Sequence, residues 1–200
     1  CQLFLNPNVV DLMIEVKNLQ KGFGGVNVLK GITTCFEPGK TNLIIGQSGS
    51  GKTVFLKSLI GLHLPEKGTI AFNGRINTEF TVEEKRQWRQ EIGMVFQGSA
   101  LFDSQTVEEN VIFPLKMFTK QTEEEMLDRV NFVLKRVNLE NSNAKFPAEL
   151  SGGMQKRVAI ARAIVMNPKY LFCDEPNSGL DPNTAIVIDN LIQEIINEYQ

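Results

Sequence analysis

No apolar stretch of the sequence reaches the roughly 20 residues that a membrane-spanning helix needs. Among the 200 residues, even the apolar segment 158–166 is interrupted by Arg162. If this protein serves a membrane, another chain must therefore span the bilayer.

Cysteine is scarce and shows no pairing pattern. The three cysteines, Cys1, Cys35 and Cys173, are an odd number, lie far apart and lack any paired ligand spacing. This pattern predicts neither a disulfide framework nor a zinc site, and it fits a reducing compartment.

An excess of positive charge is also missing. The formal net charge is -2, whereas proteins that bind nucleic acid carry basic surfaces that neutralise phosphates. A nucleic-acid partner is therefore not expected. With 42% hydrophobic residues, the chain has the composition of an ordinary globular protein rather than of a disordered segment.

Two kinds of hydrophobic pattern divide the chain. Short β-type runs separated by turn residues occupy its first part, at residues 14–16, 28–29, 32–36, 42–45 and 69–72, and they predict a mixture of two sheet types. Helical spacing follows the capping box of residues 122–125 and returns after Ser151 and in residues 183–199. Because residues 170–173 form a further buried β-type run, the pattern predicts an α/β fold.

A complete P-loop pattern lies between a predicted strand and a predicted helix, the context that this motif requires. Backbone N–H groups of its glycines turn inward around the β- and γ-phosphates, and the helix N-terminus adds a positive dipole. Lys52 supplies a positive charge and Thr53 a hydroxyl for Mg²⁺. The alternative is a glycine-rich turn without function. The residues of the motif are Gly46, Gln47, Ser48, Gly49, Ser50, Gly51, Lys52 and Thr53.

Two adjacent carboxylates follow the buried run 170–173. Asp174 and Glu175 stand at the strand end where parallel sheets hold their ligands. We expect Asp174 to hold the Mg²⁺ shell and Glu175 to orient and polarise the water that attacks the γ-phosphate. A solvated acidic turn is the alternative, and the preceding P-loop makes it the weaker one.

A third motif is the segment Leu150-Ser151-Gly152-Gly153-Met154-Gln155. Ser151 is a good N-cap and the two glycines leave the backbone bare, so the following helix would present free N–H groups to an anion. Taken alone, the segment is equally well explained as an ordinary capped helix.

The order of these motifs resembles that of ABC ATPases. The P-loop, residues 150–155, Asp174-Glu175 and Ser178-Gly179-Leu180-Asp181 carry the resemblance, which covers nearly all of residues 14–200. It implies a P-loop NTPase (RecA-like) core with an antiparallel β subdomain and an α-helical subdomain inserted at about 98–150. It also implies that residues 13–200 form one ATP-binding domain with ATP and Mg²⁺ as cofactors.

The resemblance further implies a head-to-tail dimer with two shared sites. In the family, the positions of Ser151, Gly152 and Gly153 contact the γ-phosphate bound to the P-loop of a second subunit. Asp181 matches a loop that crosses the dimer interface.

Two more roles follow from the resemblance. Gln97 matches a residue that touches Mg²⁺ or the attacking water and relays the nucleotide state to the membrane subunit. Phe23 falls where the family places an aromatic ring under adenine, a use that suits a flat apolar face. The alternatives are a surface role for Gln97 and a core role for Phe23. His63 is interpreted as a surface turn residue and not as the family's switch histidine.

Both ends of the chain depart from the family pattern. Residues 1–12 are expected to lie outside the fold, because the first plausible strand follows Met13. The family carries its switch histidine on a strand beyond the position of Glu175, and no such histidine occurs before Gln200. We therefore expect a domain that is incomplete at its C-terminal end and that binds nucleotide with little turnover. A lipidated Cys1 is a less favoured possibility, because a secreted hydrolase would lack ATP.

The segment 96–115 looks like the ATPases that serve bacterial outer-membrane lipid asymmetry. This narrower resemblance implies phospholipid transport through a separate polytopic permease, a periplasmic lipid-binding protein, and a cytoplasmic location on the inner face of the inner membrane. One alternative is that residues 96–115 merely pack the helical subdomain. Other functions are transport of another solute or of lipoprotein, and a non-transport ABC ATPase that acts on DNA or ribosomes. The acidic single cassette disfavours the last of these.

Overall fold

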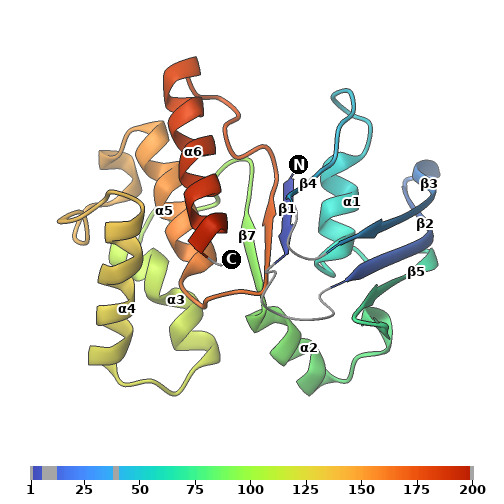
Figure 1. Cartoon of the computed structure of the whole chain (residues 1–200), viewed down its shortest axis with the longest axis horizontal. Coiled ribbons are helices and arrows are strands. Elements are labelled where there is room, and N and C mark those ends of the chain that lie inside the picture. Colours follow the sequence, from blue (N-terminus) through green and yellow to red (C-terminus); the bar gives the residue numbers. More distant parts are fainter. Residues whose placement is uncertain (1, 6–12, 38–40, 199–200) are drawn as a thin grey trace. The chain divides into compact units, whose positions relative to one another are not determined.

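The computed structural model of the chain describes residues 2–5, 13–37 and 41–198 (Figure 1). These residues divide into unit 1, which contains the described residues up to Arg89, and unit 2, which runs from Gln90 to Glu198. No helix within the described ranges is long and apolar enough to cross a membrane.

An antiparallel sheet with the strand order β3-β2-β5-β6 forms much of unit 1. The turn between β2 and β3 contains Gly24 and Gly25 at φ values of 55° and 80°, which glycine adopts without strain. Ile14, Val16 and Ile70 are fully or almost fully buried, so one face of the sheet contributes to the core. The strands are β2 (Ile14–Phe23), β3 (Val26–Phe36), β5 (Lys67–Phe72) and β6 (Arg75–Ile76).

Three sequence predictions in unit 1 need correction. Residues 28–29 and 32–36 belong to the single strand β3, because its pairing with β2 continues past Gly31. The strand predicted at 42–45 is β4 (Thr41–Leu43). Four of the twelve residues expected outside the fold form β1 (Gln2–Leu5), which pairs antiparallel with β4. Residues 1 and 6–12 lie outside the described part of the chain.

Two helices of unit 1 pack through aromatic rings. The predicted helix after the P-loop is confirmed as α1 (Lys52–Leu59), which buries Phe55, and the Phe55 ring lies 6.2 Å from the ring of Phe36. The sequence did not predict the 3₁₀ turn η1 (Asn77–Glu79) and α2 (Val82–Gln90). Because Trp88 is the one buried residue of α2 and Val82 is its only other apolar residue, the segment lacks a clear helical period.

Unit 2 contains a parallel strand pair and a group of helices. β7 (Ile92–Val95) pairs with β8 (Tyr170–Cys173), the buried strand predicted from sequence. At Gly93 a Cβ atom would lie only 2.4 Å from the carbonyl oxygen of Ala163, so a glycine is required where α5 packs on β7. Burial raises the pKa of the Cys173 thiol to about 12, which keeps this cysteine uncharged. The helices are α3 (Val107–Phe118), α4 (Glu123–Arg136), α5 (Gly152–Ile164) and α6 (Pro182–Glu198), with a 3₁₀ turn η2 (Pro147–Glu149).

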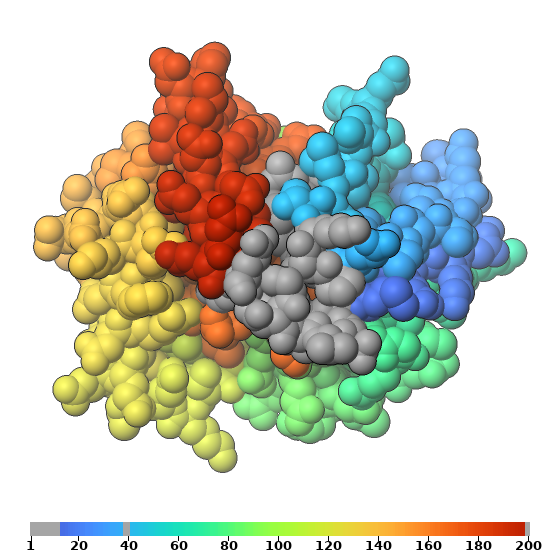
Figure 2. All heavy atoms as spheres, in the orientation of Figure 1, coloured from blue at the N-terminus to red at the C-terminus, as the bar shows by residue number. Residues whose placement is uncertain are grey.

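The helix α5 is the centre of unit 2. It contacts β7, α3, α4 and α6, and the four helices gather on one side of β7 (Figure 1). On the face seen in Figure 2, α4 and α6, in yellow and red, supply much of the surface of this unit. The predicted capping box of α4 is confirmed, with Thr122 and Glu125 bonded to each other's backbone N–H groups. The predicted helical insert at about 98–150 contains α3, α4 and η2.

Candidate functional site

The P-loop of unit 1 curls tightly in front of the first turn of α1. Gly49 and Gly51 have φ values of 78° and 94°, and a Cβ atom at Gly46 would lie 2.7 Å from Ser50 Oγ. The Lys52 ammonium donates hydrogen bonds of 2.9 and 3.1 Å to the carbonyl oxygens of Gly46 and Gln47. The positive charge is thereby held over the loop, at a helix N-terminus that favours an anion.

The end of β8 presents the two predicted carboxylates differently. Asp174 is 2% exposed, and its N–H donates to the carbonyl oxygen of Val95 on β7. Glu175 is half-buried and has a φ of 47°, a left-handed value that is strained for a side-chain-bearing residue by about 1–3 kcal/mol. Residues held in such backbone conformations cluster at functional sites, so the geometry favours a functional use of Glu175 over a solvated acidic turn.

Gln97 lies beside Glu175 although 78 positions separate them in sequence. Its amide Nε2 donates to Glu175 Oε2 at 3.1 Å and to Ser178 Oγ at 3.3 Å. Gln97 is exposed, yet these two bonds join the segment after β7 to the turn after β8. The structure therefore brings Gln97 and Glu175 into one cluster, which sequence spacing alone does not reveal.

Lys156 is a member of this cluster that the sequence did not indicate. The residue is 4% exposed on α5, and its ammonium donates to the carbonyl oxygen of Gln97. Burial lowers the pKa of Lys156, and the nearby negative charge of Asp174 opposes that shift. Lys156 thus links α5 to the Gln97 backbone, and its ammonium lies within the electrostatic influence of Asp174. The sequence indicated only that Lys156 lies within a predicted helix.

Arg162 on α5 supports the segment that follows Gln97. Its guanidinium donates hydrogen bonds of 2.8 Å to the carbonyl oxygens of both Ser99 and Ala100. These two residues have φ values of 61° and 50°, so the guanidinium stabilises a strained turn. In the sequence, Arg162 appeared only as the interruption of an apolar stretch.

The motif of residues 150–155 forms the N-terminus of α5, as predicted. Ser151 is its N-cap, and Ser151 Oγ accepts from the N–H of Met154 at 3.3 Å. Ser151 and Gly152 are exposed and Gly153 is half-buried. A Cβ atom at Gly153 would lie 2.6 Å from the Thr184 methyl group on α6. A larger residue at Gly153 would therefore push α5 and α6 apart.

Asp181 is the N-terminal cap of α6. Its carboxylate accepts from the N–H groups of Asn183 and Thr184, both at 3.1 Å. Hydrogen bonds from Thr184 are the main reason that the pKa of Asp181 is lowered. Asp181 is exposed, so it caps α6 and is also accessible for the interface role that the resemblance implies.

Phe23, at the end of β2, is 46% exposed. The ring of His63 meets it edge-on with centroids 5.2 Å apart, and the Lys21 ammonium lies 5.2 Å from its centre. Such exposure is contrary to a core role for Phe23. His63 is half-buried in the turn after α1, so its ring helps to fix the orientation of Phe23.

The predicted site residues divide between the two units. Unit 1 holds Phe23 and the P-loop, and unit 2 holds Gln97, the motif of residues 150–155, Asp174, Glu175 and Asp181. Within unit 2, the structure joins Gln97 to Glu175 directly and anchors the Gln97 backbone to Lys156 on α5.

A family model described as ABC transporter matches residues 29–178. The chain belongs to the ABC transporter family. The predicted fold class is confirmed with it, namely an α/β P-loop NTPase core that carries an antiparallel sheet and a set of helices.

Named relatives of this ABC chain belong to more than one transport system. The probable ribonucleotide transport ATP-binding protein mkl of Mycobacterium leprae is 43% identical over 182 residues, which are 91% of this chain and 52% of that protein. The methionine import ATP-binding protein MetN of Clostridium tetani is 41% identical over 188 residues, which are 94% of this chain and 59% of that protein. The chain thus spans little more than half the length of these curated relatives.

A solved structure of an ATP-binding cassette has the same fold. This is the dimeric post-hydrolysis state of MJ0796 bound to ADP and Pi, with a TM-score of 0.82 and 32% identity. The match covers 92% of this chain and 83% of that chain.

Proposed function

We propose that this chain is the ATP-binding and ATP-hydrolysing part of an ABC transporter. The observation that carries the proposal is the P-loop, where the Lys52 ammonium is bonded to the carbonyl oxygens of Gly46 and Gln47 in front of the α1 N-terminus. A triphosphate entering this loop meets a positive charge at a helix N-terminus, and the backbone N–H groups of such a loop are the usual partners of phosphate oxygens. The left-handed Gly49 has open space around it, whereas a Cβ atom at Gly51 would lie 2.9 Å from a Val28 methyl group, so the loop can pack this closely on β3 only with a glycine there.

The types of ligand that the family resemblance assigns to the metal suit a magnesium ion. Mg²⁺ prefers oxygen ligands and is held in nucleotide sites through one or two carboxylates together with substrate phosphates. Thr53, in the first turn of α1, and the buried Asp174 offer a hydroxyl and a carboxylate, and Gln97 adds an amide oxygen. Bound Mg²⁺ supplies neutralisation of the charge that develops on the transferred phosphoryl group.

Glu175 is the group that we assign to the attacking water. Its Oε2 accepts a hydrogen bond from Gln97 Nε2, which fixes the direction of the carboxylate. The left-handed backbone conformation at Glu175 determines where the side chain leaves the chain. The carboxylate orients the water and draws its proton as the oxygen approaches phosphorus. Lys156 acts as a positioning residue, because it anchors the backbone of Gln97.

A second copy of the chain completes each site in this proposal. The exposed N-terminus at Ser151 and Gly152 offers unpaired N–H groups to an anion, and the γ-phosphate on a partner's P-loop is such an anion. The related cassette MJ0796 is dimeric in its structure with ADP and Pi, which supports the association of two copies; the head-to-tail arrangement comes from the family resemblance. The partner subunit would present its own copy of this motif to Lys52.

The transported substrate that we propose is phospholipid, moved through a separate membrane permease, with the chain on the cytoplasmic side of a bacterial inner membrane and a periplasmic lipid-binding protein as a further partner. The support is the resemblance in residues 96–115, part of which forms α3. The relatives are named for ribonucleotide transport and methionine import, so these two substrates are the alternatives.

Reconstitution of the chain with its permease in phospholipid vesicles separates the three substrates. We expect ATP-dependent transfer of a fluorescent phospholipid out of the vesicles, with no change in ATP turnover on addition of methionine or ribonucleotides. Stimulation of turnover by either of these solutes, without lipid transfer, would assign the chain to that solute instead.

Replacement of Phe23 by alanine should raise the Michaelis constant for ATP about fivefold, which is about 1 kcal/mol, with little change in turnover. The exposed ring is available for stacking on adenine, and stacking is shared by ground and transition states. Inorganic triphosphate lacks adenine, so its dissociation constant should not change. The matched control is Phe132→Ala at an exposed phenylalanine of α4. Equal weakening of triphosphate and ATP would assign Phe23 to folding rather than stacking.

A further inference from the structure

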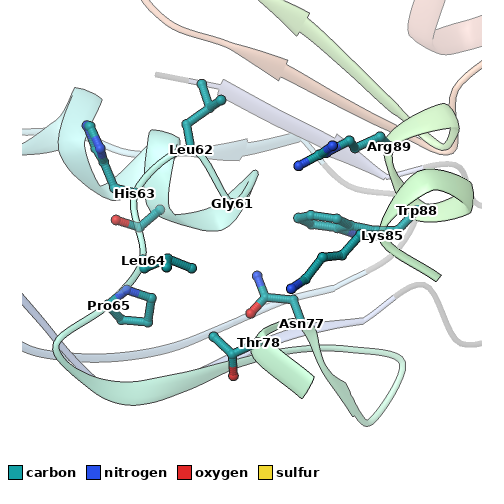
Figure 3. A pocket seen from close by; sticks show the side chains of 11 residues that line it. Gly61, Leu62, His63, Leu64, Pro65, Asn77, Thr78, Lys85, Trp88 and Arg89 are labelled. Carbon is teal, nitrogen blue, oxygen red and sulfur yellow. The ribbon is translucent and has the colours of Figure 1, made fainter. Parts of the chain in front are cut away.

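A pocket of about 360 Å³ opens in unit 1 at the C-terminal end of α1, between the turn of residues 61–65, η1 and α2 (Figure 3). Its volume falls in the range of about 300–1,000 Å³ that is typical of small-molecule sites. Lys52 begins α1 and Gly61 follows its end, so this pocket is about 12 Å of helix away from the P-loop.

The lining of the pocket is positive and has no acidic member. Lys85 and Arg89 contribute their charged side chains from successive turns of α2, and no aspartate or glutamate lies among the lining residues. Burial is the main reason that the pKa of His63 is lowered, and the charges of Lys57 and Lys21 add to it, so two further cations lie near this part of the lining. An anion is therefore the favoured ligand class, and a guanidinium pairs well with a carboxylate or phosphate.

Two buried polar atoms on this pocket lack hydrogen-bond partners. Trp88 Nε1 and Asn77 Oδ1 are two of the four such side-chain atoms among the described residues, and their side chains are 7% and 6% exposed. An unsatisfied buried group costs about 1–3 kcal/mol, so two beside one pocket call for an explanation. The indole N–H is a donor only, and an anionic oxygen is the acceptor that suits it.

Lys85 connects the charge to these atoms. Figure 3 shows its side chain extending from α2 past Trp88 toward Asn77, and both unpartnered atoms are closed to bulk water. The indole N–H becomes accessible to an anion only when this half-buried Lys85 side chain moves aside. Rotation of the Asn77 amide then offers it a donor as well.

The rest of the lining is apolar. Leu62 and Leu64 are 57% and 68% exposed on the turn after α1, and they face the pocket with Pro65. Such exposed leucines gain from contact with hydrocarbon. Taken with the two cations, this wall suits a ligand with one charged end and one apolar end.

We propose that this pocket binds a small organic anion, a carboxylate or a phosphate monoester on a short apolar body, independently of nucleotide at the P-loop. The ligand places its charged group between Lys85 and Arg89, with an oxygen toward Trp88 Nε1, and its apolar body against Leu62 and Leu64.

Trp88 is the only tryptophan of the chain, so its fluorescence reports this pocket directly. Hexanoate and butyl phosphate are titrated separately against the chain, with hexanamide as the uncharged analogue and inorganic phosphate as the head group without a body. We expect a saturable change in Trp88 emission with hexanoate, butyl phosphate or both, and the stronger of the two identifies the head group. Hexanamide and inorganic phosphate should bind about tenfold more weakly or not at all.

Three variants complete the test. Lys85→Gln and Arg89→Gln each should weaken binding of the responding anion about tenfold, and Lys85→Arg should restore it. Lys52→Ala, which removes the P-loop charge, should leave the titration unchanged. The proposal is overturned by an absence of saturable response to either anion, by an equal response to hexanamide, by binding that survives Lys85→Gln and Arg89→Gln, or by a response that Lys52→Ala abolishes. Thermal melting of each variant confirms that it is folded.

Discussion

Replacement of Glu175 by glutamine should lower the rate of ATP hydrolysis about a hundredfold or more, while ATP remains bound. Glutamine keeps the size of the side chain and can still bond to Gln97. In the wild-type chain, Gln97 Nε2 donates to Glu175 Oε2 at 3.1 Å. What it loses is the negative charge that draws the proton from the attacking water. The measurement is release of labelled phosphate, with retention of labelled ATP on the chain determined in parallel.

Glu194→Gln is the matched control for this experiment, because Glu194 is exposed on α6. It should leave both hydrolysis and ATP retention unchanged. A normal rate of hydrolysis in Glu175→Gln would show that this carboxylate is not the group that activates water, and Asp174 would then be the remaining candidate at the end of β8.

Replacement of Lys52 by alanine should weaken ATP binding about tenfold or more and abolish turnover, because each lost charge-assisted hydrogen bond contributes about 1.5–3 kcal/mol. The variant also removes the two bonds from the ammonium to Gly46 and Gln47, so part of the loss arises from a less ordered loop. Calorimetric titration with ATP measures the change.

Lys57→Ala in the last turn of α1 removes the same charge from the same helix at its other end. This control should bind ATP with nearly the wild-type affinity. If ATP binds equally well to Lys52→Ala and to the wild-type chain, the P-loop is not the phosphate site.

The local elements around the motifs were predictable because each carries a strong local signal. Thr122 and Glu125 form the reciprocal hydrogen bonds that start α4, and Ser151 caps α5 as its sequence indicates. The buried run before Asp174 is strand β8. These signals are contained within a few neighbouring residues, so no knowledge of tertiary contacts was needed.

The cluster around Glu175 was predictable only in part, because its contacts are distant in sequence. Gln97 could be assigned by family resemblance, but its bond to Glu175 depends on the parallel pairing of β7 with β8. Lys156 and Arg162 gave no signal, since a cation on a predicted helix is usually solvated and these two are held by backbone carbonyl groups. The pocket at Trp88 was missed for a related reason. The sequence of α2 is mostly polar, so it does not indicate that Trp88 packs against Phe72 and Phe80.

The edges of the fold were the least predictable part. Gln2–Leu5 contains too few residues for a periodic signal, yet the segment pairs with β4. A strand of this length is determined by the partner that its backbone finds rather than by its own propensity. The extent of β3 also depends on its partner. The interruption at Gly31 suggested two strands, but continuous pairing with β2 on both sides of Gly31 makes them one.

The central claim is that this chain hydrolyses ATP at sites shared between two copies, and the most direct test is the rate constant for phosphate release from bound ATP as a function of chain concentration. Ser151 and Gly152 are exposed at the N-terminus of α5, and in the proposed dimer they complete the P-loop site of the other copy. We expect the rate constant, however small, to rise with concentration and then to level off as the dimer saturates. A measurable rate constant that is the same at every concentration would contradict the shared site, and an absence of phosphate release at all concentrations would contradict hydrolysis by this chain.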